Sequence, residues 1–374
     1  MTSLHGHRPT RAEIDLGALE RNFLALRAHL GAIVKILAVV KADAYGHGAV
    51  PVSQRLEAVG VDAFGVAMAE EGIALREAGL RSHILVFGGH FPGQEALVIQ
   101  HNLTPVVYSL DALRALDAAA SRMGRPVPYH LKLDTGMGRL GLHPNDAVRF
   151  LVEARKLKSV QLTGVMTHLS SAEENDQSFT DLQAERFRRA FSQIEAAGIA
   201  VPLRHAANSA AALFRPDIRF DMVRAGLILY GIASSPKGTG IAAAPVMSFK
   251  TCISFLKRVP SGTPISYGRS FVATSESLIA TLPVGYADGL QRRLSNKGHS
   301  IVRGRLAPIA GNVTMDSTLI DVTNVPGVAV GDEVVLVGRQ GEQRIGAEEV
   351  AQAIGTIPYE VTCAISKRVP RVYL

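Results

Sequence analysis

Lys41 is the side chain with the clearest capacity for covalent chemistry. It follows the apolar run 36–40, which has the length and composition of a buried parallel strand, and the glycine-containing segment 42–48 predicts a turn after it. We therefore expect its amine at the carboxyl end of a strand, inside a pocket. Desolvation there lowers the pKa of a lysine from about 10.4 and makes the amine a nucleophile that can form a Schiff base. A solvated lysine at a strand end is the plainer alternative.

A second group of polar residues follows a predicted strand at 129–134. Lys132 precedes the segment 136–141, which contains Arg139 and matches the G-x-G-x-x-G pattern of dinucleotide-binding proteins. That pattern should open a helix in the first βαβ unit, whereas here the helix is expected near Pro144 and the unit is the fifth. We favour a site for a carboxylate, bound by the planar guanidinium of Arg139. A surface turn with a solvated arginine is the alternative.

Candidate ligands for an anion come later in the same pattern. Asn208 and Ser209 follow the seventh predicted strand, and Gly226 and Leu227 lie in the eighth. Barrel enzymes often bind phosphate with the loops after strands seven and eight. The Ser209 hydroxyl and the backbone N–H groups of Gly226 and Leu227 are suitable donors to an oxyanion. An ordinary Asn-Ser turn is the alternative.

Tyrosines next to glycine or proline mark the last part of the chain. Tyr267 and Tyr286 each stand beside a glycine, and Tyr359 follows a proline. Met315 lies near the end of the segment 311–316, which also opens with a glycine. Turns at these positions would let a phenol project toward a ligand. The alternative for any one of them is a half-buried strand aromatic whose hydroxyl has a partner.

The elements that must position these residues alternate between strands and helices. The strands are expected at 36–40, 63–69, 84–88, 103–108, 129–134, 162–169, 203–206 and 222–230. Helices are expected after an Asp15 N-cap and at 70–78, 110–121, 144–157 and 183–197. Eight strands in this alternation, over roughly 215 residues, predict a (β/α)8 TIM-type barrel. An open doubly wound sheet is the structural competitor.

The pattern changes after the eighth strand. The segment 234–244 is rich in Gly, Pro, Ser and Ala and is expected to be a linker. Beyond it, short β-rich segments are bounded by Gly and Pro, at 278–284, 300–302, 317–322 and 333–337. Only 346–354 has a helical pattern. We therefore expect an α/β protein with two domains, a barrel at 1–240 and a mostly-β domain at 241–374.

Composition limits the class of protein. Of 374 residues, 47% are hydrophobic and 20% charged, and the net charge of +7 is scattered, which argues against nucleic-acid binding. Cys252 and Cys363 lack the spacing of metal ligands and predict neither a disulfide nor a metal site. The segment 1–10 has no apolar leader, and no run approaches 18 apolar residues. A cytoplasmic protein without a membrane partner is expected.

Together these segments resemble the alanine racemase family, pyridoxal-phosphate enzymes of fold type III. The matching motifs are AVVKADAYGHG at 38–48, KLDTGMGRLG at 132–141, MVRAG at 222–226 and GYADG at 285–289. They occur in the order and spacing of the family, and the resemblance extends from about 15 to 359. Asp43 stands where many members have Asn, and Thr314 where some have Cys. Neither is a core catalytic position, so the activity is not put in doubt.

The resemblance implies a two-base racemisation. Lys41 would hold pyridoxal 5'-phosphate as a Schiff base and act as acid and base on one face of the substrate, while Tyr267 from the partner subunit acts on the opposite face. A single base that returned the proton to the same side would restore the starting enantiomer. A phenol has a pKa near 10 and needs help at neutral pH, which in the family comes through His168 and Arg224.

The other site residues are also carried over by the resemblance. It implies a cofactor site of Lys41, Tyr45, His168, Asn208, Ser209, Arg224, Gly226, Leu227 and Tyr359. For the substrate it implies contacts to the carboxylate from Arg139 and from Met315 of the partner, with the partner's Tyr286 narrowing the entrance. Lys132 matches a lysine that is often carbamylated; a solvated or salt-bridged Lys132 is equally open. Because Tyr267, Tyr286 and Met315 come from the other chain, a homodimer with shared sites is implied.

Several functions compete with this reading. A barrel-type amino-acid decarboxylase is disfavoured by Arg224, because an acidic residue facing the pyridine nitrogen would favour that chemistry instead. A non-catalytic pyridoxal-phosphate protein of the same barrel would lack the second domain, and a pure interaction module is the least favoured alternative. We expect an alanine racemase that supplies D-alanine for peptidoglycan. A catabolic role and a broader specificity that includes serine stay open.

Overall fold

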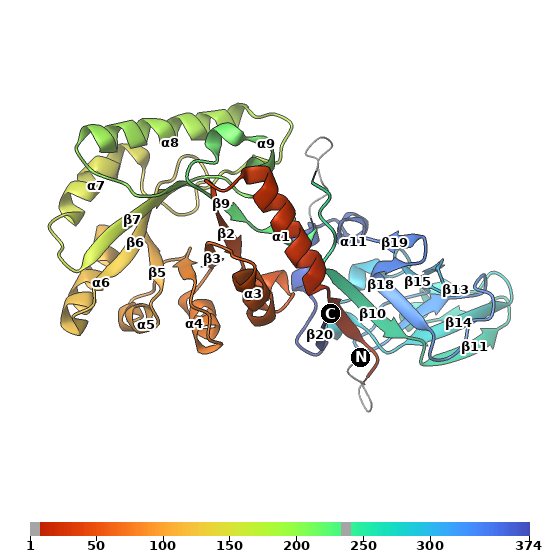
Figure 1. The fold of residues 1–374 in the computed structure, drawn as a ribbon. Helices are drawn as coiled ribbons and strands as arrows, with labels where there is room; N and C mark the ends of the chain where they lie inside the picture. The colour runs from red at the N-terminus through yellow and green to blue at the C-terminus, as the bar shows by residue number, and fades with distance from the viewer. Residues whose placement is uncertain (1–7, 233–240) are drawn as a thin grey trace.

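The computed structural model describes residues 8–232 and 241–374, and a ring of eight parallel strands forms its first large element (Figure 1). The strands are β2 (Lys35–Val39), β3 (Ala63–Val66), β4 (His83–Val86), β5 (Thr104–Val107), β6 (Val127–Lys132), β7 (Val160–Met166), β8 (Arg204–His205) and β9 (Met222–Ala225). The ladder runs from β8 through β7 to β2 and then to β9. An N–H···O bond of 2.9 Å from Arg224 to Ala207 joins the two ends. The predicted (β/α)8 barrel is confirmed.

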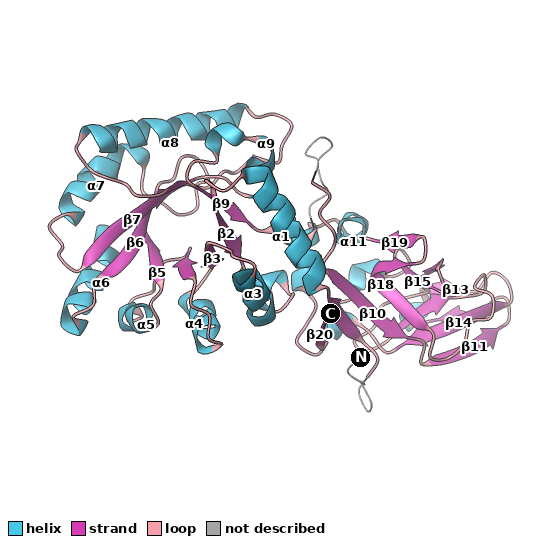
Figure 2. Ribbon diagram, viewed as in Figure 1, coloured by secondary structure: helices cyan, strands magenta, loops and turns pink. Residues whose placement is uncertain are grey.

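Helices cover the outside of this ring, as Figure 2 shows. They are α1 (Leu16–Leu30), α3 (Ala49–Ala58), α4 (Ala69–Glu77), α5 (Glu95–Gln100), α6 (Leu110–Met123), α7 (Ala147–Ala154), α8 (Ser178–Ala196) and α9 (Ser209–Phe214). The Asp15 carboxylate accepts a hydrogen bond from the Ala18 N–H at 2.7 Å, and Leu19 and Phe23 are fully buried on the inner face of α1. The N-cap and the apolar face expected from the sequence are therefore present.

The eighth strand is shorter than its apolar pattern predicted. It ends at Ala225, and the backbone then turns at Gly226 into the short helix α10 (Leu227–Tyr230). All four residues of α10 are buried. The prediction of a strand over 222–230 was wrong in its second half, because a run that is apolar on every side has no period to separate strand from helix.

The second domain is mostly β, as predicted, and contains one more helix than expected. Its strands are β10 (Met247–Cys252), β11 (Phe255–Val259), β12 (Pro264–Ile265), β13 (Phe271–Val272), β14 (Ser277–Leu282), β15 (His299–Val302), β16 (Arg305–Pro308), β17 (Thr318–Asp321), β18 (Glu333–Gln340) and β19 (Gln343–Ile345). Its helices are α11 (Ala347–Ile354) and α12 (Pro358–Cys363). The prediction of a single helical segment was wrong, because Pro358 begins α12 at a position where its missing N–H has no cost. Short 3₁₀ turns occupy Pro144–Asp146, Pro216–Ile218, Tyr267–Arg269, Tyr286–Asp288 and Arg292–Leu294.

Both ends of the described chain lie in the sheet of the second domain. β1 (Arg11–Ile14) pairs antiparallel with β10 and parallel with β20 (Arg371–Tyr373). The sheet order is β16-β15-β18-β10-β1-β20, with β19 on β18. The sequence did not predict β1. We keep the domain division at 240 and 241 as a proposal, in which β1 crosses to the second domain; of the predicted linker 234–244, residues 234–240 lie outside the described residues.

Two classes of feature are absent from the part of the chain that the structure describes. No helix there is long and apolar enough to cross a membrane. Nor does any group of three or more His, Cys, Asp or Glu side chains, among the residues described, have an arrangement that could hold a metal ion.

Candidate active site

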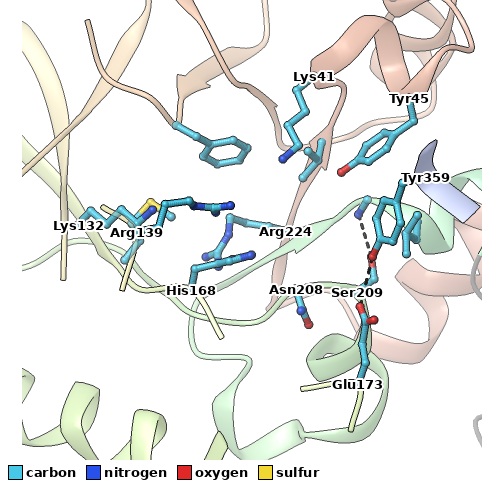
Figure 3. Close-up of a pocket in the computed structure, with 15 residues that line it drawn as sticks. Lys41, Tyr45, Lys132, Arg139, His168, Glu173, Asn208, Ser209, Arg224 and Tyr359 are labelled. Carbon is cyan, nitrogen blue, oxygen red and sulfur yellow. Dashed lines mark hydrogen bonds between the residues drawn. The ribbon is translucent and has the colours of Figure 1, made fainter. Parts of the chain in front are cut away.

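A pocket of about 180 Å³ opens at the carboxyl ends of the barrel strands (Figure 3). Eleven of the residues selected from the sequence line it: Lys41, Tyr45, Lys132, Arg139, His168, Asn208, Ser209, Arg224, Gly226, Leu227 and Tyr359. Val39, Phe87, Met166 and Glu173 complete the lining and were not selected. Tyr359 comes from α12 of the second domain, so elements of both domains build this pocket within one chain.

Lys41 enters the pocket from a left-handed turn. The segment α2 (Lys41–Tyr45) begins directly after β2, and Ala42, Asp43 and Ala44 have φ of 52–54° and ψ of 47–49°. Residues other than glycine adopt this backbone conformation at a cost of about 1–2 kcal/mol each. Strained residues of this kind occur most often at functional sites. The expected turn therefore exists, but residues 42–45 make it before the glycines at 46 and 48. Burial lowers the pKa of the Lys41 amine, and the nearby Arg139 lowers it further.

Arg224 is held by hydrogen-bond acceptors that carry no charge. Its side chain, 4% exposed on β9, donates to five acceptors: Thr167 O (2.8 Å), Ala206 O (2.7 Å), His205 O (3.1 Å), His205 Nδ1 (3.0 Å) and His168 Nδ1 (3.1 Å). Burial lowers the pKa of Arg224 to about 9. No carboxylate among the described residues forms an ion pair with it. Because a guanidinium donates and does not accept, the group is a fixed donor at the floor of the pocket.

Arg224 also determines the protonation of His168. Since the guanidinium donates to Nδ1, a neutral His168 must carry its hydrogen on Nε2. Burial, reinforced by the positive charge of Arg224, lowers the pKa of His168 to about 3. His168 is therefore neutral near pH 7 and offers an Nε2–H donor to the pocket.

The same reasoning assigns a second pair of histidines that the sequence analysis did not select. His205 Nδ1 accepts from Arg224, so its Nε2–H donates to His130 Nδ1 at 2.9 Å. Both side chains are buried in the barrel, and burial lowers the pKa of His130 to about 3 and that of His205 well below its ordinary value. Their spacing in the sequence gives no signal, because 75 residues separate them.

Donor groups converge at the other end of the pocket. The Ser209 Oγ accepts the Gly226 N–H at 2.9 Å, and Asn208 caps α9 by accepting from the Ala211 N–H at 3.0 Å. A Cβ on Gly226 would lie 2.9 Å from the Tyr45 Oη, so a side chain there would block the approach to this hydroxyl. The N–H groups that begin α9 and α10 add further donors. This arrangement suits an oxyanion.

Two tyrosines stand beside these donors. The rings of Tyr45 and Tyr359 lie 6.1 Å apart, and the Tyr359 hydroxyl donates to Glu173 Oε1 at 3.4 Å. Burial raises the pKa of Tyr359 to about 12 and that of Tyr45 well above its ordinary value. Both phenols therefore keep their hydrogens near neutral pH and can donate to an anion.

Lys132 and Arg139 lie on the opposite wall of the pocket. Lys132 is only 4% exposed, and burial together with the charges of Arg224 and Arg139 lowers the pKa of its amine to about 8. Within residues 8–232 and 241–374 it forms no ion pair. The Asp134 carboxylate accepts the N–H groups of Gly136 and Gly138, each at 3.0 Å. The G-x-G segment is therefore a turn organised by Asp134 that carries Arg139 into the pocket.

The remaining three candidates lie elsewhere. Tyr267, Tyr286 and Met315 line a separate hollow on the second domain and are 75%, 43% and 53% exposed. Hydrogen bonds to backbone oxygens fix their loops: the Tyr286 N–H donates to Thr314 O at 2.9 Å, and the Asn312 side-chain Nδ2 donates to Tyr267 O at 2.8 Å. Within one chain, the structure groups these residues with each other and not with Lys41.

Comparisons with known proteins show which family this chain is similar to. The family model "Alanine racemase, N-terminal domain" matches residues 14–234, and "Alanine racemase, C-terminal domain" matches residues 246–373. An alanine racemase of Halothermothrix orenii is 47% identical over 367 residues, covering 98% of this chain and 97% of its own. That of Geobacter sulfurreducens is 48% identical over 373 residues, with coverage of 98% and 97%.

Solved structures agree with these relatives. An alanine racemase of Clostridium difficile 630 superimposes with a TM-score of 0.92 at 37% identity, covering 98% of this chain and 96% of the other. An alanine racemase of Bacillus anthracis, solved with bound L-Ala-P, gives a TM-score of 0.92 at 34% identity, with coverage of 98% and 95%.

Proposed function

Since the chain belongs to the alanine racemase family, we propose that it interconverts L-alanine and D-alanine with pyridoxal 5'-phosphate held at Lys41. The observation that carries the proposal is the pairing of a half-buried lysine, whose pKa is lowered, with a fixed arginine donor in one pocket. The lysine can hold an aldehyde, and the arginine suits a ring nitrogen that keeps its lone pair.

The donor set fits the cofactor. The phosphate would be held by Ser209, by the N–H groups of Gly226 and Leu227, and by the hydroxyls of Tyr45 and Tyr359, with Asn208 shaping the start of α9. The Gly226 N–H and the Tyr359 hydroxyl, which donate to Ser209 Oγ and Glu173 Oε1 in the structure, would exchange these acceptors for the phosphate. All of these groups can donate, as a phosphate requires. When bound, the cofactor withdraws electrons from the substrate Cα and so acidifies its hydrogen. Arg224, as a donor, would favour an unprotonated ring nitrogen, and this would weaken the withdrawal and limit competing reactions.

Two bases on opposite faces would complete the inversion. We assign one proton to the Lys41 Nζ and the other to the Oη of the partner's Tyr267. His168 would support that phenol, because its Nε2–H can donate to a developing phenolate. The support for a partner is the exposure of Tyr267, at 75%, on a hollow of its own. A homodimer that brings the two hollows together follows from this assignment.

The contacts to the substrate would also be shared between one chain and its partner. Arg139, positioned by the glycine turn, would pair with the substrate carboxylate, and the backbone N–H of the partner's Met315 would join it. The partner's Tyr286 would narrow the entrance to a small side chain. A carbamate on Lys132 would orient Arg139, and the amine pKa of about 8 favours its formation, because the neutral amine reacts with carbon dioxide.

We assign the enzyme to the supply of D-alanine for peptidoglycan, in the cytoplasm. The support is the family as a whole, and the pocket geometry is equally compatible with a catabolic direction. A racemase that also accepts serine is the second candidate, because the residue that narrows the entrance, Tyr286, lies on the exposed hollow of the second domain.

The proposal is tested by two assays on the purified protein. In the first, borohydride reduction should attach the cofactor to Lys41, identified by peptide mass spectrometry. In the second, L-alanine and L-serine are each followed by loss of optical rotation. Failure to label Lys41 would overturn the cofactor assignment. A label at Lys41 without racemisation of either amino acid would favour the decarboxylase or the binding-protein function.

A further inference from the structure

Glu71 connects the start of helix α4 to the turn that carries Lys41. Its Oε2 accepts the N–H groups of Ala67 (2.7 Å) and Met68 (3.3 Å), which precede its own helix. Its Oε1 accepts the N–H of Ala42 at 2.7 Å. One carboxylate therefore holds backbone groups that follow two neighbouring barrel strands, β2 and β3.

The bonds to Ala67 and Met68 have an ordinary explanation. Glu71 occupies the third position of α4, from which a glutamate commonly reaches back to the N–H before the helix. The bond to Ala42 has no such explanation, because that N–H belongs to a segment 29 residues away. The carboxylate uses its second oxygen for the residue directly after Lys41.

That bond lies at the start of the left-handed turn. Inside the turn, the Ala44 N–H donates to Val40 O at 2.9 Å and the Gly46 N–H donates to Ala42 O at 3.0 Å. At the far end, the Asp43 Oδ1 accepts the Ala49 N–H at 2.7 Å. A carboxylate thus holds each end of a backbone segment whose conformation is unfavourable for its residue types.

Glu71 also contributes to the charge around the Lys41 amine. Arg139, Lys132 and His168 face it from the barrel strands' ends, and Cys363 from α12. Burial and Arg139 lower the pKa of Lys41, whereas the negative charge of Glu71 raises it. Among the charged groups that act on this amine within the described residues, Glu71 is the carboxylate that opposes the arginine.

We propose that Glu71 is a positioning residue for Lys41, which fixes the first peptide of the left-handed turn and thereby the direction in which the Nζ enters the pocket. The expected effect of Glu71 on turnover rests on the proposed function. Its physical content, the placement of an amine by a distant carboxylate, can be tested without the cofactor.

The experiment compares Glu71→Gln and Glu71→Asp with the matched control Glu70→Gln. Glu70 is the neighbouring residue in the first turn of α4; it is exposed and its Oε1 accepts from Gln94 at 2.8 Å, away from the Lys41 turn. Glutamine at 71 removes the charge and presents an amide N–H₂ to one of the backbone donors. Aspartate keeps the charge but cannot span both segments.

The first readout uses cofactor-free protein. Competitive labelling of amines with acetic anhydride over a range of pH, followed by peptide mass spectrometry, gives the pKa of Lys41. Glu71→Gln should lower it by about half a unit to one unit relative to Glu70→Gln, as expected for the loss of one nearby negative charge. Glu71→Asp should leave this pKa near that of the wild type.

The second readout is turnover of the holoenzyme. Both Glu71 variants should lose about 10-fold or more in kcat, with KM for alanine changed by less than about twofold, because the amine is displaced and the substrate contacts are not. Glu70→Gln should match the wild type. Equal labelling profiles and equal kcat in Glu71→Gln and Glu70→Gln would overturn the inference. A shifted labelling profile in a protein that racemises no amino acid would support the placement of Lys41 by Glu71 and defeat the proposed function instead.

Discussion

The two hollows of this chain differ in how their key groups are held. In the barrel pocket, Arg224 is 4% exposed and fixed by five acceptors, and Lys41 is partly desolvated. On the second domain, Tyr267 is 75% exposed, and among the described residues hydrogen bonds anchor its backbone and not its phenol. The polar groups of the barrel pocket are thus held in place by contacts within one chain. The exposed hollow has no such enclosure, and we infer that it becomes functional only against another surface.

Replacing the key group of each hollow should therefore give different defects. Lys41→Ala should abolish racemisation, by at least about 10⁴-fold, and also abolish borohydride labelling at position 41. Tyr267→Phe should lose about 10²–10⁴-fold in racemisation while Lys41 is still labelled. In deuterium oxide, Tyr267→Phe should exchange the Cα hydrogen of one enantiomer and not of the other. Exchange of both enantiomers at equal rates would argue against two separate bases.

Mixing the two inactive proteins tests whether the hollows are shared between subunits. If Lys41→Ala and Tyr267→Phe chains reassort freely, half of the dimers are mixed, and each contains one site with both native residues. The mixture should recover about a quarter of the wild-type activity. Mixing each variant with itself is the control. No recovery, or full activity of the wild type where sedimentation shows only monomer, would contradict the shared site.

The hydrogen bonds around Arg224 in the barrel pocket can be weakened while the positive charge is kept. Arg224→Lys keeps the charge but cannot reach five acceptors, so we expect a loss of about 10²-fold in kcat and a lower melting temperature, since each unpaired buried acceptor costs about 1–3 kcal/mol. Activity assays and thermal melts measure the two effects. Arg292→Lys, on the exposed hollow, should leave the melting temperature of the free chain unchanged.

Acid should destabilise the barrel through its buried and half-buried histidines. Burial lowers the pKa of His168 and His130 to about 3 and that of His47 to about 4, from an ordinary 6.5. The unfolded chain binds these protons first, so stability is full above pH 6.5 and is lost as the pH falls from 6.5 toward 3, by about 1.4 kcal/mol per unit for each histidine. Urea unfolding of the cofactor-free protein at pH 7 and pH 5 measures this loss. Replacing His130 by Asn should reduce the slope, and replacing the exposed His299 should not.

Much of the barrel could be predicted because its signals are local. Lys41 and Arg224 lie at or near strand ends that short apolar runs mark clearly. The missed elements lack such signals. Residues 227–230 are apolar on all sides, α12 is six residues long, and β1 is a four-residue strand whose partners come from 233 or more positions later. Glu71 was missed for a different reason: its sequence position explains a helix cap and says nothing of Ala42.

The alternation of strands and helices, the placement of a lysine and an arginine at the edge of the barrel, and the family to which these motifs belong all follow from the order of residues. Which groups meet is known from the folded chain: Arg224 with two histidines, Glu71 with the Lys41 turn, and the three exposed residues with each other. Backbone pattern depends on near neighbours, whereas a hydrogen bond between distant residues depends on how the barrel closes, which no local segment encodes.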